Sequence, residues 1–193
     1  LQVLLLGQNK IDAKGAIELG KNTAWANLEE LNLSKNDIRD KGASGLAKNE
    51  AWVNLQTLDL AGNKIEGEGA VELGKNKAWS NLQTLNLSKN DIRDRGAVGL
   101  ARSMVWENLQ VLDLNTNKIG AEGASELSKN KTWMNLQTLN LSYNVIEDKG
   151  AAELARNTVW TELETLDLSS NGISDQGALE LSQNTTWTNL HTF

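Results

Sequence analysis

Apolar and polar residues alternate at fixed places along this chain. In the unit that begins at Leu55, Leu58 and Leu60 alternate with the polar residues Thr57 and Asp59. Such alternation is typical of a short strand with one buried face, and the strand of each unit is expected to pair in parallel with that of the next. The opening pattern L-x-x-L-x-L-x-x-N-x-I returns in units that start at Leu1, Leu28, Leu55, Leu82, Leu109, Leu136 and Leu163, and an eighth unit opens at Leu190.

The second half of each unit predicts a helix of about two turns. Gly69 and Ala70 are small enough to let this helix approach the strand layer, and Leu73 lies one turn after Ala70 on the same face. The asparagine that follows the helix in most units is expected to end it in a left-handed conformation. An aspartate is expected to cap the start of the helix in four units. These aspartates are Asp40, Asp94, Asp148 and Asp175.

An asparagine also closes the strand of every complete unit. Its amide can bond backbone groups that are left open where the chain turns inward, so the equivalent residues are expected to form an asparagine ladder. The isoleucine two positions later is expected to point into the core. The ladder would contain Asn9, Asn36, Asn63, Asn90, Asn117, Asn144 and Asn171.

Tryptophan recurs once in every 27 residues, and all 7 tryptophans of the chain belong to this row. A fixed period of this length indicates a solenoid in which each unit contacts its neighbours. Stacked indoles could bind sugars or bases, or each indole could cap the core where the helix returns to the strand. Retention in every unit favours the structural role, because a binding site rarely needs so many copies. The row is Trp25, Trp52, Trp79, Trp106, Trp133, Trp160 and Trp187.

The repeat resembles the leucine-rich repeat family over the whole chain. The segment that contains Gly69, Ala70 and Leu73 is similar to the ribonuclease-inhibitor-like class, and especially to bacterial repeats with a Gly-Ala-x-x-Leu-Ala core. The resemblance implies an α/β solenoid, a horseshoe or arc of seven 27-residue strand–helix units plus the start of an eighth. Its parallel sheet would form the concave face and its short helices the convex face. Residues 1–193 are expected to be a single domain and a fragment of a longer chain, with Phe193 at a core leucine position.

Alternate units are more alike than neighbouring units. The unit at Leu55 shares 18 of 27 residues with the unit at Leu109, but 13 with its neighbour at Leu82. An outward strand position shows this alternation as Asn and Asp in turn, which would separate the carboxylates by roughly 10 Å and offer each one an amide donor. Pairwise duplication and a designed or recently expanded array both explain the pattern. The alternating positions are Asn32, Asp59, Asn86, Asp113, Asn140 and Asp167.

Composition argues against several classes of function. The chain has no cysteine, so disulfides, thiolate metal sites and cysteine nucleophiles are excluded. Its one histidine, His191, is placed at an outward strand position, and no serine has a histidine activator nearby. A net charge of −6 argues against nucleic-acid and anionic-membrane surfaces, and no apolar run is long enough to span a bilayer. We therefore expect no catalysis, no cofactor, no metal site, and neither nucleic acid nor membrane as a partner.

The outward strand face remains as the candidate binding surface. Solenoids of this kind bind along the concave face and the loops that follow the strands. Tyr143 is the one tyrosine of the chain and falls in the most varied row of this face, so it is the best candidate for an anchor, although an incidental tyrosine is the alternative. The expected partner is a protein of unknown identity. The candidate contact residues are Asp59, Asn86, Lys89, Asp113, Thr116, Asn140, Tyr143 and Asp167.

Three interpretations of the function stay open. The first is a protein-interaction module, for which the family resemblance implies a bacterial protein that acts on or in a host cell. The second is a structural array that associates end to end, since residues 1–6 and 190–193 show no polar cap. The third is a designed consensus scaffold without a natural ligand. The compartment stays open as well: the protein is expected to be soluble, either intracellular or secreted into a host cell.

Overall fold

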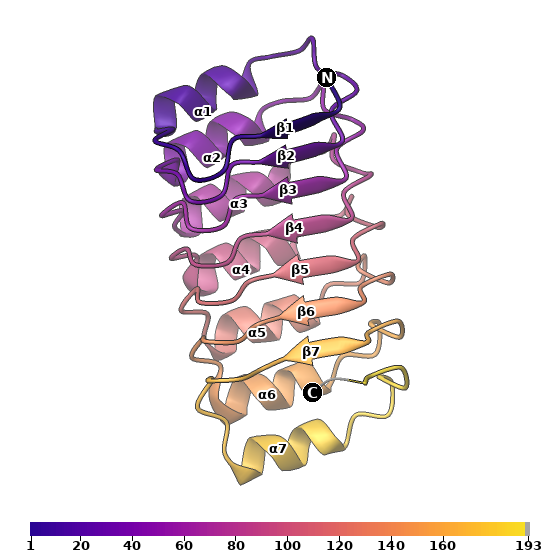
Figure 1. Cartoon of the computed structure of the whole chain (residues 1–193). Helices are drawn as coiled ribbons and strands as arrows, with labels where there is room; N and C mark the ends of the chain where they lie inside the picture. Colours follow the sequence, from indigo (N-terminus) through magenta and orange to yellow (C-terminus); the bar gives the residue numbers. More distant parts are fainter. Residues whose placement is uncertain (192–193) are drawn as a thin grey trace.

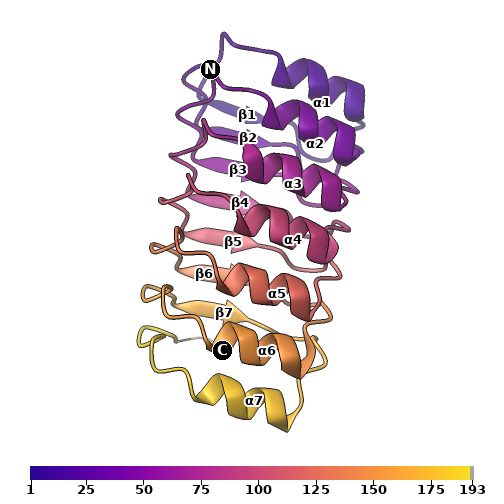
Figure 2. The ribbon, with the colours of Figure 1, turned by 180° about the vertical axis from the view of Figure 1, so that it is seen from behind.

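Strands and helices alternate in two layers along the molecule. The computed structural model describes residues 1–191, and within that range each repeat contributes one strand and one helix (Figure 1). All strands form one parallel sheet in the order β1-β2-β3-β4-β5-β6-β7, and the helices cover one face of it, the face turned toward the viewer in Figure 2. The predicted strand–helix solenoid is thus confirmed, while Phe193 lies outside the described residues.

The elements are short and regularly spaced. The strands are β1 (Val3–Leu5), β2 (Glu30–Asn32), β3 (Thr57–Asp59), β4 (Thr84–Asn86), β5 (Val111–Asp113), β6 (Thr138–Asn140) and β7 (Thr165–Asp167). The helices are α1 (Ala13–Gly20), α2 (Arg39–Ala47), α3 (Gly67–Lys75), α4 (Arg93–Ala101), α5 (Ala121–Ser128), α6 (Glu147–Ala155) and α7 (Asp175–Ser182). Among the described residues, no helix has the length and apolarity needed to cross a membrane.

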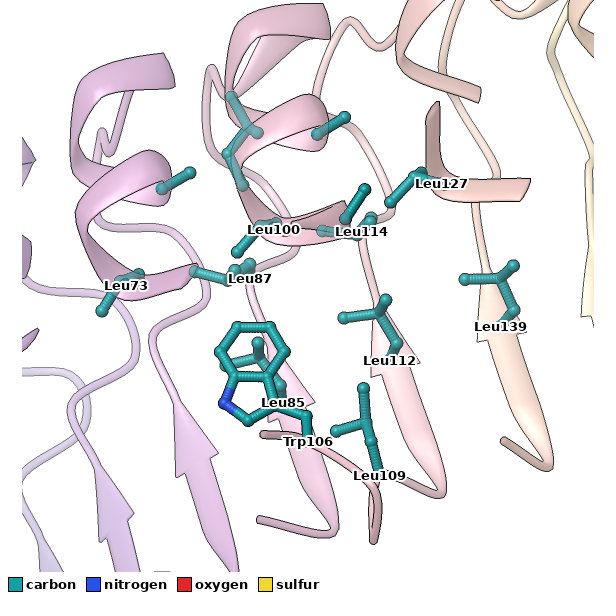
Figure 3. Packing of buried hydrophobic residues seen from close by; sticks show 14 of the residues in the cluster. Leu73, Leu85, Leu87, Leu100, Trp106, Leu109, Leu112, Leu114, Leu127 and Leu139 are labelled. Atoms are coloured by element: carbon teal, nitrogen blue, oxygen red, sulfur yellow. The ribbon is translucent and has the colours of Figure 1, made fainter. Parts of the chain in front are cut away.

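The core is a column of leucines between the two layers. The register pairs each strand residue with its equivalent in the next repeat, so that Leu85 stands beside Leu112 and Leu112 beside Leu139. Leu100 approaches them from the helix layer (Figure 3). All four side chains are fully buried, and burying a leucine stabilises the fold by about 1.5–3 kcal/mol. The alternation of apolar positions seen in the sequence therefore corresponds to one continuous core.

The tryptophans belong to this core. Trp106 is fully buried and lies near Leu85 and Leu109 (Figure 3). The indole Nε1–H groups of six of the tryptophans find no hydrogen-bond partner among the described residues. An indole that stacks on a sugar or a base needs an open face, so the structural interpretation of this row is the correct one for the buried members. They are Trp52, Trp79, Trp106, Trp133, Trp160 and Trp187, whereas Trp25 is partly buried.

The asparagines after the strands bond the turning backbone of two repeats at once. The Nδ2 of Asn63 donates to the carbonyl of Leu33 at 2.8 Å and to that of Leu60 at 3.0 Å. The Oδ1 of Asn90 accepts from the backbone N–H groups of Asn63 and Ile65, each at 2.9 Å. Because carbonyls and N–H groups of both repeats are satisfied by the same amides, these side chains fix the spacing between repeats.

The asparagines after the helices correct one prediction. Asn76 has φ −62° and ψ 130°, which is extended and not left-handed backbone. Its Oδ1 accepts from the N–H groups of Ala78 and Trp79, and its Nδ2 donates to the carbonyls of Ala47 and Asn49 in the preceding repeat. Asparagine therefore fits this position because its amide can donate and accept hydrogen bonds at the same time. Its tolerance of positive φ plays no part.

The aspartates expected to cap their own helices do something else. Asp94 lies inside the first turn of α4, and its Oδ1 accepts from the N–H groups of Gly120 and Gly123 at the start of α5, at 2.6 and 2.9 Å. Asp148 acts in the same way on α7, and Asp40 accepts from the N–H of Glu66, the N-cap of α3. Asp175 is the first residue of α7, after the N-cap Ser174. Three of the four aspartates thus cap the helix of the following repeat.

Glycines set the distance between neighbouring helices, and not only that between helix and sheet. A Cβ on Gly99 in α4 would lie 2.5 Å from Cγ2 of Val71 in α3, and a Cβ on Gly74 would lie 2.4 Å from the carbonyl oxygen of Gly99. Gly20 and Gly45 form the same contact between α1 and α2. Close helix packing at the α1–α2 and α3–α4 junctions therefore alternates with aspartate capping at α2–α3 and α4–α5, whereas Ser128 and Glu153 occupy the two glycine positions at α5–α6.

Candidate functional site

The predicted contact residues form two neighbouring rows on the strand face, which we define as the outward side chains of β1–β7 with the loop residues that follow them. Asp59, Asn86 and Asp113 are adjacent in the sheet register. Asn140 and Asp167 continue this row across β6 and β7. The second row, at the loop tips, contains Lys89, Thr116 and Tyr143, and all three side chains are exposed.

The row of Asn and Asp is held by local hydrogen bonds. The Oδ1 of Asn140 accepts from the backbone N–H and the hydroxyl of Ser142, and the Oδ1 of Asp113 accepts from the N–H of Asn115 at 2.9 Å. The expected donation from each asparagine amide to the next carboxylate does not occur among the hydrogen bonds of residues 1–191. The serine two residues later donates to the asparagine Oδ1, and within residues 1–191 the Nδ2 bonds no carboxylate of this row, so alternation relieves charge repulsion by spacing alone.

The carboxylates of this row differ in acidity. Burial raises the pKa of Asp113, and the negative charges of Asp59 and Asp167 raise it further. Burial also acts to raise the pKa of Asp167, but the hydrogen bonds that its carboxylate accepts from the hydroxyl and N–H of Ser169 act in the opposite direction, and the net pKa is lowered. Between Asp113 and Asp167, the carboxylate on β5 is therefore the one whose negative charge is less stable in the folded protein.

The loop tips after the strands have left-handed backbone. Lys89, Thr116 and Tyr143 have φ values of 56°, 55° and 55°. Their N–H groups each donate to a carbonyl of the following repeat, as Tyr143 does to Ser169 at 2.8 Å. This conformation is costly for residues other than glycine, and the inter-repeat bond stabilises it. The side chains in this row therefore project from a fixed backbone.

Tyr143 and Val145 form an exposed apolar pair at one loop, and we call it the Tyr143–Val145 patch. Their exposed fractions are 63% and 53%. In the equivalent loop two repeats earlier, Asp91 stands in the place of Val145 and binds Arg93 at 2.7 Å and Lys118 at 3.0 Å. The sequence prediction missed Val145. Val145 could have been found by comparing it with Asp37 and Asp91, which occupy the same position in the second and fourth repeats.

A charged ridge continues from this patch toward β1. Asp37 binds Arg39 at 2.8 Å and Lys64 at 2.9 Å, and the hydrogen bonds from Arg39 and Lys64 lower the pKa of Asp37 to about 2. The ion pair between Asp91 and Arg93 repeats this arrangement, and the hydrogen bond from Arg93 lowers the pKa of Asp91. The ridge thus places fixed charges of both signs beside the strand face.

Chemical groups for metal binding are not assembled in the described part of the chain. Between residues 1 and 191, no group of three or more His, Cys, Asp or Glu side chains is placed to hold a metal ion. His191 is exposed, and its N–H donates to the carbonyl of Glu164. The arrangement offers polar hydrogen-bonding rows on β2–β7, one aromatic side chain at the loop tips, and exposed Val3 and Leu5 on β1, and these are the features of a contact surface.

Comparison with known families gives a match in six successive repeats. The family model described as Leucine Rich repeat matches more than half of the chain. No curated protein sequence matches this chain. The matched segments are residues 26–47, 53–74, 80–101, 107–128, 134–155 and 161–182.

Solved structures with a similar fold come from plants and bacteria. One is the ectodomain of the membrane receptor kinase GASSHO1/SCHENGEN3 from Arabidopsis thaliana in complex with CASPARIAN STRIP INTEGRITY FACTOR 2 (TM-score 0.54, 21% identity, 100% of this chain and 26% of that one). Another is the plant peptide hormone receptor RGFR1 in complex with RGF2 (TM-score 0.53, 22% identity, 100% and 32%). The protein LIC12759 of Leptospira interrogans is also similar (TM-score 0.52, 24% identity, 100% and 48%). This chain therefore spans less than half the length of each.

Proposed function

This chain belongs to the leucine-rich repeat family, and from that premise we propose that it is a protein-interaction scaffold that binds a protein partner through its strand face. The observation that carries the proposal is the Tyr143–Val145 patch, an exposed apolar pair beside the polar rows of β2–β7; exposed Val3 and Leu5 stand at the β1 end of the same face. Large aromatic side chains beside hydrogen-bonding groups are typical of the residues that dominate protein interfaces. Two of the similar plant receptors are described in complex with CASPARIAN STRIP INTEGRITY FACTOR 2 and with RGF2, which supports a binding role.

Each row has a role in the proposed interface. Tyr143 is the anchor, because it offers a large contact area and loses little conformational freedom on binding. Lys89 and Thr116 lie in the same loop row and contact polar groups of the partner at the rim of the interface. The strand row supplies hydrogen-bond acceptors and amide donors in register. Its members are Asp59, Asn86, Asp113, Asn140 and Asp167.

The finer classification also belongs to the proposal. The helix in the second half of every described repeat supports the ribonuclease-inhibitor-like class. The Gly-Ala-x-x-Leu segments of the sequence support the bacterial type of repeat and, with it, a role in contact with a host cell. We further propose that residues 1–193 are one repeat domain within a longer protein.

The strand face can be tested by selecting peptides from a random display library against the immobilised protein. We expect the double substitution Tyr143→Ala with Lys89→Ala to weaken binding of the selected peptides at least about tenfold, since loss of an interface anchor costs about 2 kcal/mol or more. The matched control is Lys14→Ala with Lys149→Ala, which removes two exposed side chains from α1 and α6 and should leave the affinity unchanged. Equal affinities for the double variant and the unsubstituted protein would refute binding through this face.

A further inference from the structure

The helix layer contains a groove that is separate from the strand face. It lies beside the close contact of α3 and α4 and has a volume of about 690 Å³, which is within the range of pockets that hold small ligands or single side chains. Gly74 and Gly99 form part of its wall because the two helices approach each other there. The groove belongs to a different surface from Tyr143, so any ligand there would be separate from the one proposed above.

The floor of this groove is aliphatic. Val71 and Val98 face it from the two helices, and Met104 and Val105 close it from the loop that leads to β5. Met104 is 74% exposed, and Val98 and Val105 are partly exposed. A methionine at an open apolar surface adapts to the shape of what binds there, because its side chain is flexible and polarisable. The floor can therefore accept an apolar side chain of a ligand.

The rim of the groove is cationic. Lys75, Lys77, Arg95 and Arg102 line it, and no carboxylate is among its lining residues. Lys75 and Arg95 are balanced by Glu72 and Glu68, but Lys77 and Arg102 form no ion pair among residues 1–191. The chain as a whole carries a net charge of −6, so a local excess of positive charge stands out and complements an acidic ligand.

The equivalent groove two repeats earlier shows which features are particular to this one. It lies between α1 and α2, with a volume of about 710 Å³, and it keeps the basic residues Lys21, Lys41 and Lys48. Ser44 stands there in the place of Val98, and Glu50 in the place of Met104. Its floor is therefore more polar and its rim includes a carboxylate, so it serves as an internal control.

We propose that the groove between α3 and α4 is a second docking site, which binds a short acidic segment of another protein that carries an apolar side chain between its carboxylates. The apolar side chain lies on Val71, Val98 and Met104. The flanking carboxylates pair with Lys77 and Arg102. The aliphatic floor accounts for affinity, and the cations select acidic over neutral or basic segments.

The chain has 2 methionines, which makes a direct test possible. The probe is the blocked peptide acetyl-Glu-Asp-Leu-Phe-Asp-Glu-amide, titrated into protein labelled with ¹³C at the methionine methyl groups. We expect the Met104 signal to shift, while the signal of Met134, whose side chain lies outside the lining of the groove, stays in place. The same peptide with amides in place of its acids should bind at least about tenfold more weakly, because it loses its charge pairing.

Substitutions separate this site from its control and from the strand face. Val98→Asp places a carboxylate on the floor and should abolish the Met104 shift, whereas Ser44→Asp in the equivalent groove should leave it intact. Lys77→Glu with Arg102→Glu should weaken binding about tenfold or more. Tyr143→Ala should have no effect on this titration, so failure of one proposal is distinguishable from failure of the other. Thermal unfolding of each variant checks that it is folded.

Several outcomes would overturn the proposal. Equal shifts of both methionine signals, or no shift at millimolar peptide, would show that the groove does not select this ligand. Retention of the Met104 shift in folded Val98→Asp would show that the peptide binds elsewhere. Sedimentation of the protein with anionic phosphatidylglycerol vesicles, combined with no peptide binding, would assign the cationic rim to a lipid surface instead.

Discussion

Replacement of Asp94 tests whether one carboxylate couples neighbouring repeats. The Oδ1 of Asp94 accepts from the N–H groups of Gly120 at 2.6 Å and Gly123 at 2.9 Å, which are otherwise open at the start of α5. A hydrogen bond to a charged group contributes about 1.5–3 kcal/mol, and loss of a helix cap costs about 1–2 kcal/mol. Since Asp94 is only half-buried, water partly replaces it, and we expect Asp94→Ala to lower the free energy of unfolding by about 2 kcal/mol.

The control for this substitution is Glu122→Ala. Glu122 is an exposed acidic residue in the first turn of α5, so it shares the favourable interaction with the helix dipole but lies on the solvent side. We expect its loss to cost about 0.5 kcal/mol or less, and Asp94→Asn to fall between the two, because an amide oxygen still accepts. Urea unfolding followed by tryptophan fluorescence measures all three. Equal losses for Asp94→Ala and Glu122→Ala would show that the carboxylate acts through the dipole alone.

Three further predictions concern stability. Trp106→Ala should cost about 3–5 kcal/mol in urea unfolding, and Trp187→Ala less because it lies in the last described repeat; equal losses would contradict this. Asp113→Asn should stabilise the protein at neutral pH, because the folded pKa of Asp113 is raised above its unfolded value; the gain should vanish as the pH falls below about 4, where the unfolded carboxyl is protonated too. Lys89→Gly should stabilise by up to about 1 kcal/mol and Gly62→Ala should destabilise by a similar amount, since both positions have positive φ; opposite signs in thermal melts would argue against strain there.

Strands, core and the tryptophan row could be predicted because each depends on periodicity within one repeat. Leu58 is buried since its neighbours in sequence already define the inward face, and the same holds for Ile65. The interpretation of Asp94 failed for the opposite reason. An aspartate near the start of a helix satisfies the local rule for an N-cap, but its partners, Gly120 and Gly123, lie one repeat later, and local rules do not reach that far.

The candidate surfaces could be predicted only in part. The strand row could be predicted from the sequence because the parallel register follows from the repeat length. Tyr143 could be predicted because it lies at the loop position that varies most between repeats. The positive φ at that loop was not predicted, since Lys89, Thr116 and Tyr143 are not residues that favour it. The groove between α3 and α4 depends on how closely two helices approach, and only the contact between Gly74 and Gly99 reveals that distance.

Two kinds of junction alternate over the first five repeats, and this alternation makes deletions within them informative. From an even to an odd repeat, an aspartate such as Asp40 or Asp94 caps the next helix, and Asp37 or Asp91 pairs with a lysine of the next loop. From the first to the second repeat and from the third to the fourth, helices pack through glycines instead. Junctions of the two kinds are therefore not interchangeable, although all repeats have the same length.

Deletion of residues 82–108 removes one repeat and brings the third against the fifth. α5 then loses its cap from Asp94, and Glu126 takes the place of Gly99, where a Cβ would lie 2.5 Å from Val71. Deletion of residues 55–108 removes two repeats but restores an even-to-odd junction, at which Asp40 can cap α5 and Asp37 can pair with Lys118. Shorter repeat arrays are ordinarily less stable, because they have fewer interfaces. We nevertheless expect the longer deletion to leave the more stable protein, with the higher urea midpoint. The reverse order would mean that the repeats are equivalent and that their alternation carries no energetic weight.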